Sequence, residues 1–253
     1  MVERSSAGDP GRTLELLWRH ELGERPPQRG PRKGLSIDQV VDAAIVLADS
    51  DGLAAVTMRR VAESLGVSTM SMYTYVPGKA ELLDLMLDGI YQRMPREPLA
   101  HLPWRERVAL VAAQNRQLYR RHPWALKVST SRPPLGPGLI AKYEHELGAF
   151  LDLGLDDVHI DQALTLVLDF VQAAARSEAE AEAAQRDSAT TDEQWWRANE
   201  PILAAVFDPA KYPNAARIGS AGGAEYRGPS SPGHAYDFGL QRILDGLETL
   251  VGD

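Results

Sequence analysis

The chain has 253 residues, a net charge of −8, and apolar and charged fractions of 44% and 25%, which are ordinary for a globular protein. It contains no cysteine, which excludes disulfides, thiolate zinc sites and a cysteine nucleophile. No apolar run is long enough to cross a membrane, and the first thirty residues lack the apolar stretch of a secretory signal. We therefore expect a cytoplasmic protein with no membrane partner and with room for one large domain or two modest ones.

Residues 1–34 are predicted to be an extension that is partly disordered. A short helix is expected over Thr13–Leu22, but the prolines and glycines between Pro26 and Gly34 forbid regular structure there. Four basic residues fall within nine positions that hold no acid, namely Arg25, Arg29, Arg32 and Lys33. Two interpretations of this basic arm stay open: a solvated tail, or a segment lying along DNA phosphates.

A change of pattern after Gly34 marks the start of a domain predicted to span residues 35–94. Ser36 with Gln39 three residues later reads as a capping box, and apolar side chains then recur at helical spacing as far as Ala48. Asp51-Gly52 ends this first helix. The segment 35–94 holds four basic residues against eight acidic ones, so any case for DNA binding depends on where the charges lie.

Two short helices and a longer one are expected after this first helix. Thr57 can cap a short helix that Gly66 ends, because only glycine adopts a left-handed conformation without penalty. A third helix is expected over Ser68–Tyr75, since Pro77 disfavours helical geometry just before it. A fourth runs over residues 79–94. Two short helices joined by a tight glycine turn are typical of a helix-turn-helix.

Prolines 95, 98 and 103 mark the junction with a second domain, predicted to span residues 95–253 and to bind an effector and dimerise. Helices are expected over 104–121, 139–151, 157–185, 193–207 and 234–251. Residues 208–233 are rich in glycine, proline and serine, and a long mobile loop is expected there. The predicted fold class is therefore all-α, with an N-terminal three-helix helix-turn-helix domain and a larger helical ligand-binding and dimerisation domain.

The stretch from Val56 to Asp84 reads VTMRRVAESLGVSTMSMYTYVPGKAELLD and resembles the TetR family of transcription regulators. The matching features are the Thr-x-Arg entry at Thr57, Leu-Gly-Val at the turn around Gly66, Tyr73, and Lys79 at the start of the fourth helix. This resemblance covers about sixty residues strongly and implies binding to double-stranded operator DNA.

Met72 and Val76 are expected to anchor the recognition helix inward. Its outward side suits DNA, because no acid occurs between Ser68 and Val76 to repel phosphate. Serine and threonine hydroxyls bind bases or phosphates, and Met70 can contact a thymine methyl group. The resemblance implies that Arg59 reads a base and that Thr57, Tyr73 and Lys79 hold phosphate. The full predicted DNA-binding set is Thr57, Arg59, Ser68, Thr69, Met70, Ser71, Tyr73, Thr74, Tyr75 and Lys79.

The second domain resembles the tetracycline-repressor C-terminal domain more weakly, through Trp104 and the string Thr130-x-Arg132-Pro133. This resemblance implies a homodimer in which residues 161–185 and 236–251 pair with their copies. It also implies a small-molecule effector in a mostly apolar pocket between helices. The candidate ligand-binding residues are Asn115, Tyr119, Tyr143, Phe150, Asp169, Gln172 and Trp195. Val128 falls where that repressor has a metal-binding histidine, which disfavours metal-chelated tetracycline as the effector.

An enzymatic role is not expected. The six histidines show no metal-ligand spacing, and the sequence has neither a glycine-rich phosphate loop after a strand nor a nucleophile elbow. We predict no catalytic residue, metal site or cofactor. The predicted function is a DNA-binding transcriptional regulator, with a repressor released from its operator by a small molecule favoured over an activator. The alternative is a ligand-binding or interaction protein that does not bind DNA. The effector, the operator and the regulated genes stay open.

Overall fold

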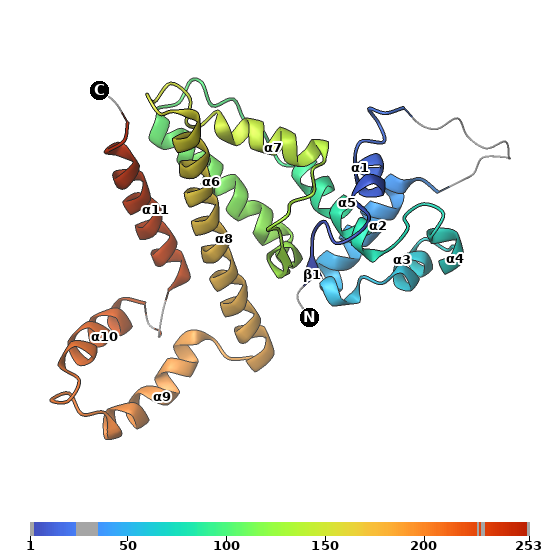
Figure 1. Ribbon diagram of the computed structural model, residues 1–253. Coiled ribbons are helices and arrows are strands. Elements are labelled where there is room, and N and C mark those ends of the chain that lie inside the picture. Colours follow the sequence, from blue (N-terminus) through green and yellow to red (C-terminus); the bar gives the residue numbers. More distant parts are fainter. Residues whose placement is uncertain (1–2, 24–34, 227, 229–230, 252–253) are drawn as a thin grey trace.

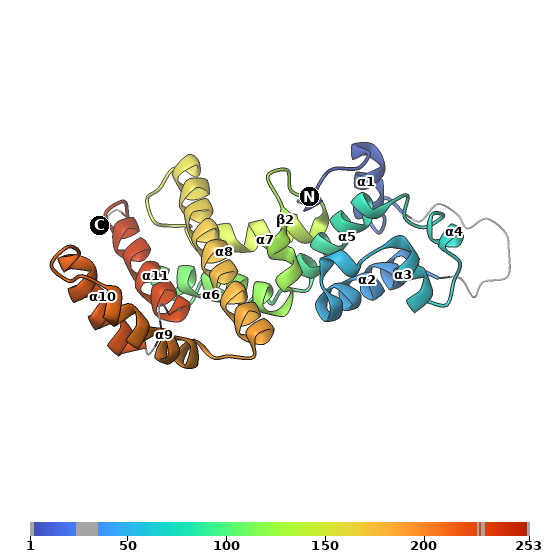
Figure 2. The same ribbon diagram turned by 90° about the horizontal axis from the view of Figure 1, so that it is seen from below.

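The computed structural model describes residues 3–23, 35–226, 228 and 231–251, and these residues form eleven α-helices (Figures 1 and 2). The two short strands among them, β1 (Glu3–Arg4) and β2 (Val128–Ser129), pair in parallel. The predicted all-α class is confirmed. No helix of the described residues is both long and apolar enough to cross a bilayer.

The predicted helix-turn-helix begins with α2 (Ile37–Asp51), followed by α3 (Met58–Ser64) and α4 (Thr69–Met72). The capping box at the start of α2 is confirmed: the Ser36 hydroxyl accepts from the Gln39 N–H, and the Gln39 side chain accepts from the Ser36 N–H. α4 is shorter than the helix expected over 68–75, because the backbone tightens into a turn after Met72.

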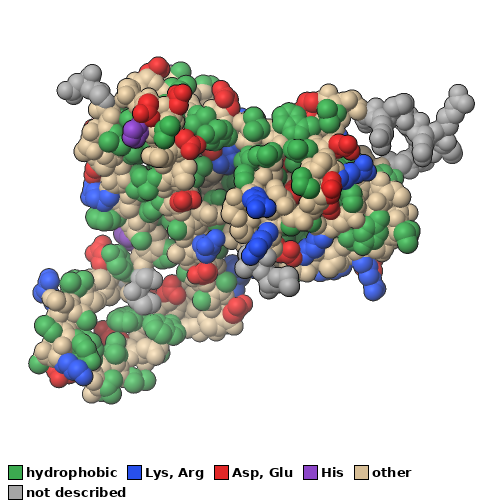
Figure 3. Space-filling view, viewed as in Figure 1, with side chains coloured by type: hydrophobic (Ala, Val, Ile, Leu, Met, Phe, Trp, Pro, Cys, Tyr) green, Lys and Arg blue, Asp and Glu red, His purple; other side chains and the backbone are tan. Residues whose placement is uncertain are grey.

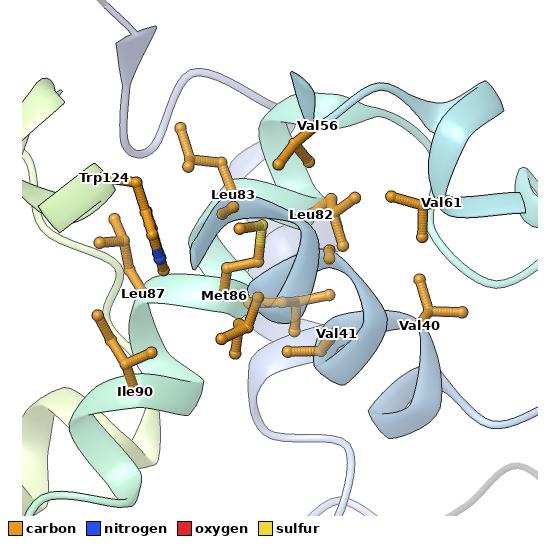
Figure 4. Close-up of a cluster of buried hydrophobic side chains, with 14 of the residues drawn as sticks. Val40, Val41, Val56, Val61, Leu82, Leu83, Met86, Leu87, Ile90 and Trp124 are labelled. Atoms are coloured by element: carbon orange, nitrogen blue, oxygen red, sulfur yellow. The ribbon is translucent and has the colours of Figure 1, made fainter. Parts of the chain in front are cut away.

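Helix α5 (Lys79–Gln92) lies at the centre of the molecule and is buried without interruption from Glu81 to Asp88. These eight consecutive residues span more than two helical turns, so every face of the helix is covered. The apolar side chains of α5 meet those of α2 and α3 in one cluster (Figure 4). Trp124, from the short 3-10 helix η2 (Pro123–Lys127), points into the same cluster.

The C-terminal part is a layered bundle in which α8 (Asp157–Ser188) packs between α6 (Trp104–Arg121) and α11 (Pro232–Glu248). α8 and α11 meet through a stacked ring pair, Phe170 and Tyr236, with centroids 5.8 Å apart. A Cβ at Gly239 would lie 2.5 Å from the Phe170 ring, so α11 comes this close to α8 only because position 239 is glycine.

Helix α7 (Pro137–Leu147) is fixed to α5 through its own N-terminus. Both oxygens of Asp88 accept from backbone N–H groups there, from Gly138 at 3.1 Å and from Leu139 at 2.8 Å. A Cβ at Gly138 would stand 2.2 Å from the Asp88 carbonyl oxygen. The two helices therefore touch backbone to backbone, and the capping carboxylate satisfies the first donors of α7.

The segment before α2 is packed against the rest of the chain as far as Arg19, whereas residues 20–23 are exposed. Its helix is α1 (Pro10–Leu17), which starts earlier and ends earlier than the one expected over 13–22 because Asp9 caps it and Pro10 fits its first turn. Leu16 and Leu17 are buried in the cluster around α5. The basic arm at 25–33 lies outside the described residues.

The expectation of a long loop over residues 208–233 was wrong. α10 (Pro213–Tyr226) occupies this stretch, and with α9 (Asp192–Val206) it forms an arm beside the bundle (Figure 2). Its alanines favour a helix enough to offset the glycines that suggested a loop. Neither helix buries a side chain among the described residues, and apolar groups gather on the arm's surface (Figure 3).

Candidate nucleic-acid interface and ligand pocket

The turn between α3 and α4 is held by backbone hydrogen bonds. The Leu65 N–H donates to the Val61 carbonyl at 3.3 Å, and the Val67 N–H reaches the Ala62 carbonyl at 3.0 Å. Gly66 between them has a φ of 68°, the left-handed conformation that the sequence pattern required. The Ser68 hydroxyl then caps α4 by accepting from the Ser71 N–H at 3.1 Å. This turn sets the angle at which α4 leaves α3.

We expect Gly66→Ala to lower the free energy of unfolding by about 1–2 kcal/mol, because a side chain in the left-handed region strains the backbone. No heavy atom lies within 4 Å of the position a Cβ would take, so a clash contributes nothing. Urea denaturation measures the effect. Gly246→Ala is the matched control, since that glycine lies inside α11 in equally open space with an ordinary φ. The control should be neutral or stabilising, and equal losses in both variants would contradict the strain argument.

Helix α4 turns one side inward and leaves the other free. Met72 and Val76 are fully buried, as the sequence pattern predicted, and anchor the helix and the turn after it. Met70 is 78% exposed and Tyr73 is 49% exposed. Of the remaining predicted contacts on this segment, Ser68, Ser71 and Thr74 are exposed, whereas Thr69 and Tyr75 are half-buried. Tyr75 packs partly against the core, so its aromatic ring serves the fold as well.

The three predicted DNA contacts outside residues 68–75 lie in different settings. Thr57 is exposed, and its hydroxyl caps α3 by accepting from the Arg60 N–H at 3.2 Å. The Arg59 side chain is 79% exposed and pairs along α3 with Glu63, Nε to Oε1 at 2.8 Å. Lys79 opens α5 and its Nζ lies 2.6 Å from Oε1 of Glu3. Nothing in the sequence pattern indicated Glu3, because it lies 76 residues away.

Each of the eight acids of residues 35–94 has a hydrogen-bond or ion-pair partner within the chain, although only three of the eight are buried. Glu81, Asp84 and Asp88 are buried on α5, and burial raises the pKa of Asp84 to about 6. Asp49 accepts from Trp124 Nε1 at 2.8 Å. The balance of eight acidic to four basic residues in this region therefore says little about the charge of the surface that carries Met70 and Tyr73.

A cavity of about 380 Å³ opens where α8 passes the segment after η2. It brings together Asp169 and Gln172, two of the predicted ligand-binding residues, with Thr130 of the Thr-x-Arg-Pro string. Its complete lining is Leu126, Lys127, Val128, Ser129, Thr130, Ser131, Asp169, Gln172 and Arg176. This lining is richer in hydroxyl and charged groups than the apolar pocket expected from sequence.

The other predicted ligand residues are spread over the C-terminal part. Asn115 is buried in α6 and its Nδ2 donates to Glu146, which also accepts from Lys142 Nζ at 2.7 Å. Tyr119 lies one turn further along α6, and burial raises its pKa to about 12. The sequence pattern missed Glu146 and Lys142, because a Lys and a Glu four residues apart usually mark an exposed helix face.

Three predicted ligand residues lie apart from both the cavity and the Asn115 cluster. Phe150 is buried in the core of the bundle. Tyr143 is exposed, and its hydroxyl donates to Asp161 at 2.7 Å. Trp195 is exposed on α9. The structure therefore does not gather the seven candidates into one site. Among the described residues, no group of three His, Asp or Glu side chains is placed to hold a metal ion.

A short helix with an exposed acid-free face, set by a glycine turn on a buried anchor and joined to a helical bundle, defines a helix-turn-helix transcription regulator. Family models match both parts of the chain. Residues 40–86 match bacterial regulatory proteins of the tetR family, and residues 97–251 match the tetracyclin repressor-like C-terminal domain. The chain belongs to the TetR family, as the motif around Gly66 predicted.

Known proteins agree with this assignment. The chain is 45% identical to the HTH-type transcriptional repressor DrrR1 of Streptomyces coeruleorubidus, over 99% of this chain and 90% of the relative. Its fold is similar to that of Streptomyces coelicolor ActR in complex with actinorhodin, with 24% identity and a TM-score of 0.70 over 88% of this chain and 99% of that one. A structure of BioQ with its natural double-stranded DNA operator is 28% identical, with a TM-score of 0.51 over 57% of this chain and 88% of that one. The family and these relatives are transcription regulators rather than enzymes.

Proposed function

We propose that the protein is a homodimeric repressor that binds a double-stranded operator through α4 and is released by a small-molecule effector. The observation that carries the proposal is the free face of α4, acid-free and held in place by the buried Met72 and Val76. The repressor DrrR1, 45% identical over nearly the whole chain, supports repression over activation. As a regulator of DNA the protein acts in the cytoplasm, and the proposal includes no catalytic step.

In this proposal the exposed residues of α4 enter the major groove. Met70 is placed to contact a thymine methyl group, while the hydroxyls of Ser68, Ser71 and Thr74 bind base edges or phosphates. Arg59, after releasing Glu63, reads a base, most simply as a bidentate contact to guanine. Tyr73 and Lys79 bind phosphate, and Lys79 is helped by the positive end of the α5 dipole.

Pairing of two chains through α8 and α11 would place two α4 helices on one face of a near-palindromic operator, about 34–36 Å apart. Both helices carry large apolar side chains that no described residue of the chain covers. The most exposed are Val158 and Leu166 on α8 and Phe238 on α11. A four-helix interface would bury these groups, as the family resemblance implies.

We place the effector in the cavity lined by Asp169 and Gln172, where hydroxyl and charged groups suit a polar small molecule. One wall of the cavity, residues 126–131, begins within the last two residues of η2. η2 carries Trp124, which is buried against α5 in the core of the helix-turn-helix region. A ligand that shifts this wall can therefore move α5 and the spacing of the two recognition helices, provided that it prefers one of the two arrangements.

The test is operator binding, measured by fluorescence anisotropy with DNA from upstream of the protein's own gene. We expect Arg59→Ala to weaken binding by about 1–3 kcal/mol and to relax the sequence preference, because a base contact is lost. Lys79→Ala should weaken all duplexes similarly and reduce the dependence of log K on log salt by about one unit, because a phosphate contact is lost. Binding should saturate at two chains per operator.

The two variants control for each other, since each removes one cation near α4. Equal effects on sequence preference would contradict the assigned roles. If the wild-type protein ignored duplex DNA at low ionic strength, the alternative of a ligand-binding or interaction protein without DNA binding would replace the regulator.

A further inference from the structure

Residues 3–9 form a strap that ties the two parts of the chain together, and the family resemblance accounts for none of it. On one side the strap adds to the C-terminal part. Glu3 and Arg4 pair with β2, and the Ser5 N–H donates to the Ser129 carbonyl at 3.1 Å. The buried Ser5 hydroxyl donates to the Arg132 carbonyl at 2.6 Å. The strap is thus bonded to the segment that lines the cavity, since Val128 and Ser129 belong to both.

On its other side the strap is bonded to α5. The Ser6 N–H donates to Oδ1 of Asp84 at 2.8 Å, and the Asp9 N–H donates to Oε1 of Glu81 at 3.2 Å. The approach at Gly8 is close, because a Cβ there would lie 2.2 Å from the Glu81 carboxylate. The strap therefore lies beside the first two turns of α5, which begins at Lys79.

At Lys79 the strap places the carboxylate of Glu3 against a proposed DNA contact. Oε1 of Glu3 lies 2.6 Å from Nζ of Lys79, and both side chains are partly open to solvent. An operator phosphate bound by Lys79 would need the same ammonium group that Glu3 occupies. The carboxylate beside it would also repel the phosphate.

An isolated pair of this kind would be weak, because two long side chains must be ordered in water to form it. Here the bonds of Ser5 and Ser6 already fix the backbone that carries Glu3, so less freedom is lost when the pair forms. The pair is thus held in place by the bonds of the neighbouring strap residues, to the C-terminal part and to α5, rather than by its own attraction.

We propose that Glu3 competes with operator phosphate for Lys79, so that the strap lowers DNA affinity and ties it to the position of the cavity wall at β2. This inference rests on the proposed function of Lys79 as a phosphate contact. Because β2 and Ser129 hold the strap, an effector that moves the cavity wall moves the competitor as well, and the coupling is reciprocal.

The experiment is a double-mutant cycle on the full chain, with anisotropy titrations of the operator duplex at low ionic strength. The variants are Glu3→Gln, Lys79→Gln and both together. We expect Glu3→Gln to tighten binding about 2- to 5-fold, the range that an exposed ion pair spans. In the Lys79→Gln background the same change should have no effect, because the shared ammonium is gone. Glu15→Gln, which removes the same charge from the exposed face of α1, should leave affinity unchanged.

The outcomes separate the two claims. If Lys79→Gln weakens binding but Glu3→Gln leaves it unchanged, the strap does not compete and this inference fails while the proposed function stands. Equal gains from Glu3→Gln with and without Lys79, or an equal gain from Glu15→Gln, would show a general charge effect and would also overturn it. If Lys79→Gln has no effect, the phosphate contact itself is wrong and the inference falls with it.

Discussion

Trp124→Ala is expected to lower the free energy of unfolding by about 3–5 kcal/mol, the loss typical of a large aromatic side chain removed from a core. Trp124 is only 2% exposed and comes from η2, yet it lies in the cluster that α2, α3 and α5 form. Its Nε1 donates to Oδ1 of Asp49 on α2 at 2.8 Å. Urea denaturation followed by circular dichroism measures the loss.

Trp124→Phe is the matched control, because it keeps most of the ring volume but removes the N–H donor. Asp49 would still be bonded to Nδ1 of His122 at 2.8 Å, so this variant should lose only about 1 kcal/mol. A loss as large as that of Trp124→Ala would show that the hydrogen bond, rather than packing, holds the two parts together. A negligible loss in both variants would contradict the cluster that Trp124 shares with α2, α3 and α5.

Asp84→Asn is expected to raise the free energy of unfolding at pH 7 by about 2–3 kcal/mol, the value of a pKa shift of roughly two units. Asp84 is fully buried, its Oδ2 has no hydrogen-bond partner among the described residues, and burial raises its pKa to about 6 from the ordinary 3.8. An amide keeps the acceptor that Ser6 N–H uses at Oδ1. The substitution removes the buried charge but leaves an NH2 group at the position of Oδ2, where no described residue accepts a hydrogen bond, so the gain is at most this value.

The raised pKa of Asp84 also sets the direction in which the free energy of unfolding changes with pH. Between about pH 4 and pH 6 the folded protein keeps the Asp84 proton that the unfolded chain has lost, so stability falls as pH rises through this window. The full cost is present above about pH 6, and below about pH 4 it vanishes, so the gain from Asp84→Asn should vanish there too. Asp88→Asn is the control: both Asp88 oxygens cap α7, so that variant should be destabilising. If both variants raised the free energy of unfolding, the cause would be the lower net negative charge of the chain rather than the burial of Asp84.

The helix-turn-helix was predictable because its signals are local. Ser36, Gly66 and Pro77 act within a few residues of themselves, and Met72 and Val76 were placed inward by helical spacing alone. The boundary between domains after residue 94 stays a prediction, since α5 shares its core with η2. The predicted DNA contacts likewise stay predictions until binding is measured.

What the sequence did not indicate depends on residues far apart in the chain. Glu3 reaches Lys79 only because β1 pairs with β2, and two two-residue strands leave no periodic pattern to detect. The cavity combines residues 126–131 with Asp169 and Gln172, a union set by how α8 crosses η2. α10 was missed because local glycine content outweighed alanine content in the prediction.

The burial of α5 on all its faces couples the unfolding of the two parts of the chain. Both parts of the chain pack against α5. If either part unfolded, α5 would expose apolar side chains to water and would lose stability. The bundle and the helix-turn-helix region should thus unfold in a single cooperative transition. A ligand held near β2 would then protect the distant α4 from heat and proteases without touching it.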